Sequence, residues 1–252
     1  MSKFQHSLGN NKISFLKFLS SFVSKISLEF AGLFFDIDKK NSEIIISSSF
    51  HAPWKEDLEF ANFYLKIKKD TLLDIKRLYT LWYLSKSLRN INASILDIGC
   101  CKGGSGYALS KINNKGKTYL IDTFEGPKIK ENLVTKDHYI FNDVDYVNDK
   151  IKILNLKDTI VLKTFFPNNL SSVFKKEKIK ICHIDVNTTM ATKLAFQYVK
   201  SRIIKDGIII FDDYGIYSVD SVKKYVDYIR KNFSNEFTFI NNYMGQCILI
   251  KK

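Results

Sequence analysis

The sequence predicts an α/β fold: a doubly wound, seven-stranded and mostly parallel sheet that follows an N-terminal helical extension. Two patterns support this prediction. Short runs of Ile, Val and Leu alternate with helical patterns over residues 91–252, and such runs are typical of strands buried on both faces of a parallel sheet. Right-handed crossovers between parallel strands then favour a doubly wound arrangement.

Residues 1–90 are predicted to form the extension. Apolar side chains recur at three- and four-residue spacings over residues 13–35, which predicts a helix with one apolar face. A short strand is expected at 43–50 and a second helix at 70–89. We expect this part to cover a binding site or to form a homodimer contact, and a helix lying on a membrane surface is the alternative.

The main domain, residues 91–252, shows a regular alternation of strands and helices. Its last two strands are joined by a turn through Gly245 and should pair antiparallel at the sheet edge. The polar connection at 128–150 is expected to be a lid over an acceptor site. The predicted strands are 94–98, 117–122, 159–163, 179–185, 207–211, 237–240 and 247–250, and the predicted helices are 104–112, 188–203 and 218–232.

The net charge of +13 over 252 residues suggests an anionic partner such as nucleic acid. Only four of the 39 basic residues are Arg, however, and Arg is the residue suited to bidentate phosphate and base contacts. The charge is also spread along the chain, with 14 basic and nine acidic residues in the first 90. The sequence therefore argues against a nucleic-acid partner and favours a solvated, Lys-rich surface.

The cysteines and the hydropathy pattern bound the compartment. The four cysteines form no C-x-x-C pair, so neither a disulfide framework nor a structural zinc site is expected. This usage favours a reducing compartment, the cytoplasm. The most apolar early stretch, residues 15–35, is interrupted by Lys17, Lys25 and Glu29, whereas a membrane-spanning helix needs about 20 largely apolar residues. We therefore expect no membrane span.

Ligands of a doubly wound sheet bind beyond the carboxyl ends of its strands, and the first two strands end in informative residues. A glycine-rich turn, residues 99–106, follows the first strand. Glycine lets the backbone approach a ligand, and the next helix offers free N–H groups, although a tight turn without a ligand would use the same residues. Asp122 ends the second strand, where an acid suits hydrogen bonding to ribose hydroxyls. Together these features predict a site for a ribose-containing cofactor.

Three acids follow the fourth and fifth strands. Asp185 comes after the former, and Asp212 and Asp213 come after the latter. Adjacent carboxylates are costly unless they are paired or bind a cation, and oxygen-only ligands suit Mg²⁺ or Ca²⁺. The alternative is that one Asp caps the following helix while another pairs with a Lys. His183 lies two residues before Asp185 and is interpreted as a structural hydrogen-bonding residue.

Four segments of the chain resemble the macrocin O-methyltransferase (TylF-type) family. They are Asp122-Thr-Phe-Glu-Gly-Pro127, Lys163-Thr-Phe-Phe-Pro167, His183-Ile-Asp185 and the stretch Asp206–Gly215. The resemblance covers about residues 91–252 and implies the Rossmann-like fold of class I methyltransferases. It further implies S-adenosylmethionine as cofactor and a sugar hydroxyl as acceptor, on a nucleotide-linked sugar or on a glycan or natural-product precursor.

The resemblance also assigns roles to single residues. The glycine-rich turn would hold the methionine part of the cofactor, and Asp122 its ribose. A Mg²⁺ ion would be held by Asp185, Asp212 and Asp213 and would lower the pKa of the acceptor hydroxyl, with Asp185 as the catalytic residue. The expected cofactor-binding residues are Asp97, Gly99, Gly103, Gly104, Ser105, Asp122 and Phe124.

The chain departs from the family pattern directly after His183-Ile-Asp185. The pattern H-I-D-x-D-x-Y is usual there, whereas this sequence has Asn187 and Thr189. Asn187 can offer a neutral oxygen ligand, with one negative charge fewer. Two other functions stay open: an RNA or protein methyltransferase with the same fold, and a binding protein without catalysis.

Overall fold

The computed structural model describes residues 10–34, 44, 52–126, 141, 143–168, 174, 177–216 and 220–252. The chain divides into two compact units, Met1–Glu56 and Asp57–Lys252. In the first unit, α1 (Asn10–Ala31) overlaps the helix predicted at 13–35, and a short 3-10 helix spans Pro53–Lys55. The strand predicted at 43–50 lies outside the described residues, apart from residue 44.

Two helices of the second unit precede the sheet, α2 (Leu58–Ile67) and α3 (Ile75–Leu88). Each begins at an aspartate whose carboxylate accepts backbone N–H groups of the first turn, Asp57 for α2 and Asp74 for α3. The sequence predicts α3 but not α2. Both helices belong to the same compact unit as the sheet. This unit begins at Asp57, whereas the sequence prediction placed the start of the main domain at residue 91. The role of the first 90 residues as a cover or dimer contact stays a prediction.

Within the part of the chain that the structure describes, seven strands form one sheet in the order β3-β2-β1-β4-β5-β7-β6. The first five strands run parallel, and β7 pairs antiparallel with both β5 and β6. This arrangement confirms the predicted mostly parallel, doubly wound sheet with a closing hairpin. The strands are β1 (Ser94–Ile98), β2 (Thr118–Asp122), β3 (Thr159–Lys163), β4 (Ile179–Ile184), β5 (Ile203–Phe211), β6 (Phe237–Asn241) and β7 (Cys247–Lys251).

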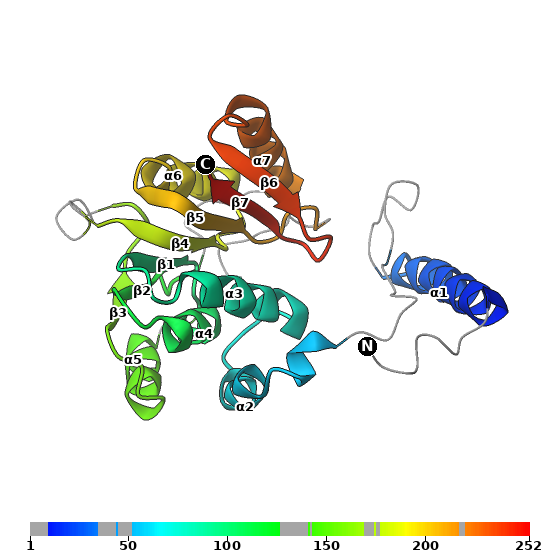
Figure 1. Cartoon of the computed structure of the whole chain (residues 1–252), viewed down its shortest axis with the longest axis horizontal. Coiled ribbons are helices and arrows are strands. Elements are labelled where there is room, and N and C mark those ends of the chain that lie inside the picture. Colours follow the sequence, from blue (N-terminus) through cyan, green and yellow to red (C-terminus); the bar gives the residue numbers. More distant parts are fainter. Residues whose placement is uncertain are drawn as a thin grey trace. The chain divides into compact units, whose positions relative to one another are not determined.

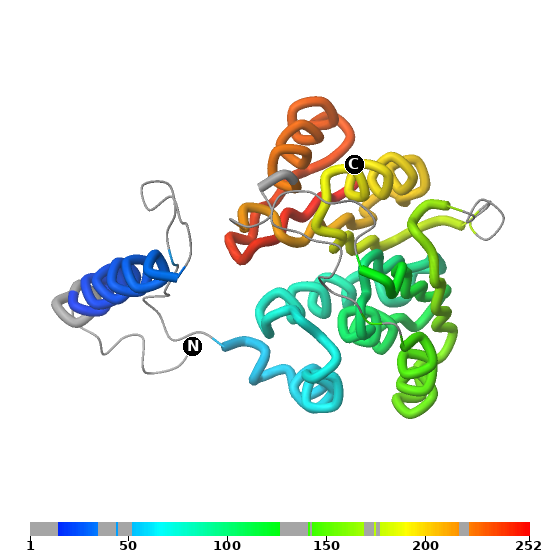
Figure 2. The backbone as a smooth tube through the Cα atoms, turned by 180° about the vertical axis from the view of Figure 1, so that it is seen from behind, coloured from blue at the N-terminus to red at the C-terminus, as the bar shows by residue number. Residues whose placement is uncertain are grey.

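Helices cover both faces of the sheet (Figure 1). On one face lie α3, α4 (Gly104–Ile112) and α5 (Val144–Ile153), and on the other lie α6 (Thr189–Val199) and α7 (Asp220–Asn232). The path of the chain through these layers can be followed from behind in Figure 2. The main core lies between the sheet and the helices α6 and α7, where the Phe196 ring packs against the rings of Phe211 and Phe237.

Two segments differ from the sequence prediction for identifiable reasons. The helix expected to reach residue 203 ends at Val199, and β5 begins at Ile203 because that residue pairs with Ile179 across an irregular register. The connection at 128–150 contains most of α5, which begins where Asp143 accepts the Tyr146 N–H at 2.7 Å. Residues 128–140 and 142 of the expected lid lie outside the described residues. None of the described helices has the length and apolar character needed to cross a bilayer.

Lys180 holds the loops at the amino ends of the strands together by hydrogen bonds, opposite the carboxyl ends where ligands bind. Its buried ammonium donates to the carbonyl oxygens of Ile91 at 2.8 Å and Lys115 at 2.9 Å, and to Asn113 Oδ1 at 2.7 Å. Burial lowers its pKa to about 8. The side chain therefore joins the approaches to β1 and β2 to the start of β4.

Replacing Lys180 by Met should lower the free energy of unfolding by about 2–3 kcal/mol, because the substitution leaves several buried oxygens without a donor. Chemical denaturation measures the loss. Lys178→Met, an exposed lysine two residues earlier, is the matched control and should cost less than about 0.5 kcal/mol. Equal effects of the two substitutions would contradict this role.

Candidate active site

A cavity of about 230 Å³ lies at the carboxyl ends of the parallel strands. The strand order reverses between β1 and β4, because the chain proceeds from β1 to β2 on one side and from β4 to β5 on the other. Ligands of doubly wound sheets bind at such a reversal. The cavity walls come from the glycine-rich turn, the ends of β2 to β5, and residues 70–73 before α3.

Close backbone approaches explain two glycines of the turn. Gly99 has a φ of +93°, and a Cβ there would lie 1.8 Å from the carbonyl oxygen of Asp185. The Gly104 N–H donates to the Asp70 carbonyl at 2.9 Å, and a Cβ on Gly104 would lie 2.6 Å from that oxygen. Only glycine fits where β1 ends beside β4 and where α4 begins beside the 70–73 loop.

Asp122 fastens this turn to the end of β2. Its Oδ2 accepts the Cys101 N–H at 2.8 Å, and its Oδ1 accepts the Phe124 N–H at 2.7 Å. Burial raises the pKa of Asp122 in spite of these two hydrogen bonds, which favour the ionised form. Oδ1 also accepts the Thr123 hydroxyl at 3.5 Å, whereas Oδ2 keeps a second lone pair that can accept a hydroxyl donated by a ligand in the cavity.

The residues predicted to bind the cofactor separate into two groups. Gly99, Gly104, Ser105 and Asp122 line the cavity, whereas Asp97, Gly103 and Phe124 do not. Asp97 is buried beneath the turn, where its Oδ2 accepts the Ser105 hydroxyl at 2.7 Å. Gly103 caps α4, and Phe124 is a buried ring that contributes its backbone N–H to Asp122. These three residues therefore support the cavity wall from behind.

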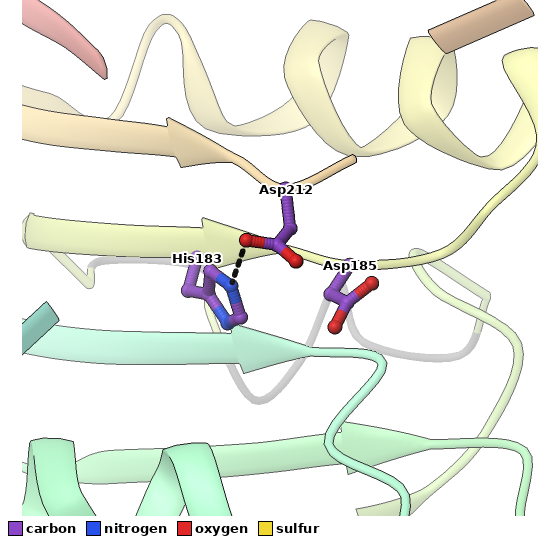
Figure 3. A group of neighbouring side chains, drawn as sticks. All are labelled: His183, Asp185 and Asp212. Carbon is purple, nitrogen blue, oxygen red and sulfur yellow. Dashed lines mark ion pairs between the residues drawn. The ribbon is translucent and has the colours of Figure 1, made fainter. Parts of the chain in front are cut away.

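The structure brings the acids after β4 and β5 together, as predicted (Figure 3). His183, Asp185 and Asp212 each have a candidate ligand atom within 4.8 Å of the others. His183 Nδ1 bonds Asp97 Oδ1 at 2.7 Å, and its Nε2 faces Asp212 Oδ1 at 3.9 Å, an ion-pair distance too long for a hydrogen bond. Burial disfavours the imidazolium, but Asp212 and Asp97 outweigh that effect and raise the pKa of His183 to about 10. His183 is therefore a buried cation among the acids.

Arg77, a residue of the candidate site that was not predicted from the sequence, supplies the second cation. It projects from α3, and its Nη1 lies 2.5 Å from Asp212 Oδ2 and 3.2 Å from Asp213 Oδ1. Its Nε bonds Asp74, the residue that caps α3, at 2.9 Å. Only the rarity of Arg in the chain marks this position in the sequence, since 135 residues separate Arg77 from Asp212.

The three carboxylates differ in how they are held. Asp212 is fixed at both oxygens, because Gln246 Nε2 donates to its Oδ1 at 2.7 Å while Arg77 holds Oδ2. Burial and the charge of Asp212 raise the pKa of Asp213 to about 6, against the opposing effect of Arg77. Burial and the charges of Asp212 and Asp213 raise the pKa of Asp185 well above its usual range. No group among the described residues donates a hydrogen bond to the Asp185 carboxylate.

The donor set fits a hard divalent cation. Four carboxylates, including the Asp97 that His183 Nδ1 bonds at 2.7 Å, face two cations, the partly buried Arg77 and the buried His183, so formal negative charge remains uncompensated. Asn187 also lines the cavity, and its buried Oδ1 has no hydrogen-bond partner among the described residues. Carboxylate and amide oxygens are the ligands that Mg²⁺ prefers. His183 is not part of this set, because an imidazolium has no free lone pair.

Three aromatic residues lie beside these elements. Phe165 and Phe166 line the cavity, as expected from their position after β3. Tyr214 does not, because its hydroxyl turns toward α7 and donates to Asp227 at 2.7 Å. Tyr214 therefore joins the end of β5 to α7 and is not a wall of the cavity.

Solved structures share this fold. NovP, an O-methyltransferase, aligns with a TM-score of 0.61 at 15% identity, over 73% of this chain and 82% of its own. CalS11, a calicheamicin methyltransferase, gives a TM-score of 0.58 at 10% identity, over 80% and 94%. A putative caffeoyl-CoA O-methyltransferase from Staphylococcus aureus gives 0.57 at 15%, over 79% and 96%. At these identities the likeness concerns the fold, which is that of class I methyltransferases.

The family follows from the sequence match. The model of the macrocin-O-methyltransferase (TylF) family matches residues 71–242. The chain therefore belongs to this family and is an O-methyltransferase, as the motif resemblance implies. The matched segment begins before α3 and so includes Arg77. No match is found among curated proteins.

Replacing Arg77 by Met should destabilise the protein by about 2–3 kcal/mol at pH 7.5, because a partly buried ion pair loses one partner. The pKa values of Asp185 and Asp213 would then rise further above that of an unfolded aspartate. Protonation on acidification consequently favours the folded variant, and the deficit should shrink toward pH 5. Denaturation at both pH values measures it.

Arg89→Met, at the exposed end of the same helix, is the control for this experiment and should show no pH-dependent deficit. A deficit of Arg77→Met that is the same at pH 7.5 and pH 5 would show that Arg77 does not compensate the acids.

Proposed function

We propose that the protein transfers a methyl group from S-adenosylmethionine to a sugar hydroxyl, on a nucleotide-linked sugar or on a glycan or natural-product precursor. The observation that carries the proposal is the juxtaposition in one cavity of a ribose-type acid, Asp122, and a buried acid cluster at Asp185, Asp212 and Asp213. Among the structures with this fold, CalS11 is a TDP-rhamnose 3'-O-methyltransferase, and an O-methyltransferase from Bacillus cereus is in complex with SAH.

The two ends of the cavity suit the two substrates. The glycine-rich turn would let the backbone approach the amino-acid part of the cofactor closely. The Asp122 carboxylate would accept hydrogen bonds from its ribose. The acid cluster lies at the ends of β4 and β5. The cationic sulfonium of the cofactor and the acceptor hydroxyl would bind next to it. Carboxylates stabilise a nearby cation and can activate a hydroxyl, so the reaction centre belongs between the turn and the cluster.

The reaction is a displacement at the methyl carbon. The acceptor oxygen forms a bond to this carbon while the carbon–sulfur bond breaks, and the electron pair stays on the departing thioether sulfur. The hydroxyl proton goes to Asp185, the carboxylate to which no described group donates. Asp185 lines the cavity, so its carboxylate is placed to accept a proton from a bound hydroxyl. Arg77 and Gln246 hold Asp212 in place meanwhile.

A bound Mg²⁺ would be held by Asp185, Asp212 and Asp213, with Asn187 as a neutral oxygen donor. When bound, this ion lowers the pKa of a coordinated hydroxyl. Asn187 stands where the family pattern H-I-D-x-D has a second acid, so the site would carry one negative charge fewer. The free cysteines agree with a reducing compartment such as the cytoplasm, which stays part of the proposal.

Substitution of Asp185 by Asn should lower kcat by at least about 100-fold, because the amide cannot accept the hydroxyl proton. The assay supplies S-adenosylmethionine, Mg²⁺ and a panel of nucleotide-linked sugars, and it follows methyl incorporation. Asp206→Asn, at an exposed residue of β5, is the control and should keep full activity. Full activity of Asp185→Asn on an identified acceptor would rule out this base. Methylation of RNA or protein instead of any sugar would replace the proposed acceptor class.

Asp122→Asn should weaken binding of S-adenosylhomocysteine by about tenfold or more, since its amide N–H₂ would face a backbone donor and lose a charge-assisted bond. Isothermal calorimetry measures the affinity. The exposed Asp145→Asn serves as control and should bind like the wild type. Unchanged affinity of Asp122→Asn would separate this acid from cofactor binding.

Removal of divalent cations with EDTA should abolish most of the transferase activity, and Mg²⁺ should restore it, because the acid cluster keeps an uncompensated negative charge without the ion. Binding of S-adenosylhomocysteine should survive the treatment, since the turn and Asp122 hold no ion. Full turnover in EDTA would mean that Arg77 and His183 compensate the acids sufficiently by themselves.

A further inference from the structure

The turn between β6 and β7 reaches the acid cluster through one buried amide, that of Gln246. The antiparallel register pairs Phe211 with Cys247, so the next residues along, Asp212 and Gln246, lie opposite each other. Gln246 is fully buried, and its Nε2 donates to Asp212 Oδ1 at 2.7 Å. It is not among the residues that line the cavity, so a ligand there would meet Asp212 and not Gln246.

The orientation of this amide is fixed by Asn242. Asn242 Nδ2 donates to Gln246 Oε1 at 2.9 Å, which leaves Gln246 Nε2 directed to Asp212. Asn242 is itself held, because its Oδ1 accepts the backbone N–H groups of Met244 at 2.9 Å and of Gln246 at 3.1 Å. A flipped Gln246 would set oxygen against oxygen at Asp212 and nitrogen against nitrogen at Asn242.

The same turn is fastened to the segment that carries the acids. The Tyr214 N–H donates to the Gly245 carbonyl at 2.8 Å, two residues beyond Asp212. A Cβ on Gly245 would lie 3.8 Å from Arg77 Cδ, so the turn also lies near the cation that holds the other oxygen of Asp212. Asp212 is therefore clamped between α3 and the hairpin turn.

We propose that Gln246 is a positioning residue for the methyl-transfer site: with Asn242 behind it, its amide fixes the Asp212 carboxylate from the side opposite Arg77. This inference rests on the proposed function. Gln246 lies outside residues 71–242, the segment that the family model matches. A buried amide donor satisfies one lone pair of Asp212 Oδ1 without adding charge, and it holds the carboxylate beside the cavity that Asp212 lines.

Gln246→Met tests the proposal, because it keeps the size of the side chain and removes the donor. We expect kcat to fall about 10- to 100-fold, while the KM for S-adenosylmethionine and the affinity for S-adenosylhomocysteine stay within about twofold. Gln246→Glu keeps an acceptor for Asn242 but sets a carboxyl group against Asp212, and it should lose at least as much. The same two substitutions at the exposed Gln197 of α6 are the matched controls.

An unchanged kcat in Gln246→Met would overturn the proposal. So would a parallel loss of kcat, cofactor affinity and thermal stability, since that pattern marks a purely structural residue. If Gln246→Met does not fold, Asn242→Asp decides: it removes only the donor to Gln246 Oε1, and kcat should fall while cofactor affinity holds. Its control is Asn241→Asp, whose Oδ1 contact to the Tyr243 N–H an aspartate preserves.

A measurement without turnover separates this inference from the proposed function. In the wild-type protein the side-chain N–H protons of Gln246 should exchange with water at least about tenfold more slowly than in Asp212→Ala, as read by NMR. If no acceptor is methylated but this protection is found, the proposed function fails and the clamp stands. If the wild-type amide exchanges freely, Gln246 does not hold Asp212 and the inference is wrong.

Discussion

The structure depends on the compensation of negative charge at one end of a parallel sheet. Asp97, Asp185, Asp212 and Asp213 lie at the carboxyl ends of β1, β4 and β5, buried or half-buried and close enough to repel one another. Without partners, such a group of carboxylates would take up protons or separate. The fold instead surrounds the acids with a buried imidazolium, a guanidinium from α3 and an amide from the last hairpin. Each of these partners comes from a different part of the chain.

This requirement explains why the site extends beyond the sheet. The helix α3 precedes the first strand, yet Arg77 makes it part of the acid cluster, and Asp74 both caps the helix and holds the guanidinium. The closing hairpin at first resembles only an edge of the sheet, but its turn supplies Gln246. The glycine-rich turn is tied in through Asp97, which bonds Ser105 and His183 with its two oxygens. The glycine-rich turn and the acid cluster are therefore linked through Ser105, Asp97 and His183, and the last link, from His183 to Asp212, is an ion pair and not a hydrogen bond.

Much of this could be predicted from the sequence, because strand ends in a parallel sheet meet at one edge. The alternation of Ile-rich runs and helices gave the sheet, and the residues after those runs gave Asp122, Asp185, Asp212 and Asp213. The partners of these acids were missed for a physical reason: Arg77 and Gln246 reach the cluster only through tertiary packing, and neither stands in a recognisable local pattern. The helix α2 was missed because its short aromatic stretch is stabilised by packing on α3, as between Phe60 and Trp82. Phe124 illustrates the converse, since its place in the motif suggested a ligand contact while its ring is buried.

In the proposed reaction, methyl donor and acceptor meet between the glycine-rich turn and the acid cluster. A crystal structure of the protein with S-adenosylhomocysteine and Mg²⁺ tests it most directly. We predict that the ribose hydroxyls donate to Asp122, that the sulfur faces Asp185, and that the ion lies among Asp185, Asp212 and Asp213. A ligand whose ribose avoids Asp122, or whose sulfur points away from Asp185, would contradict the account.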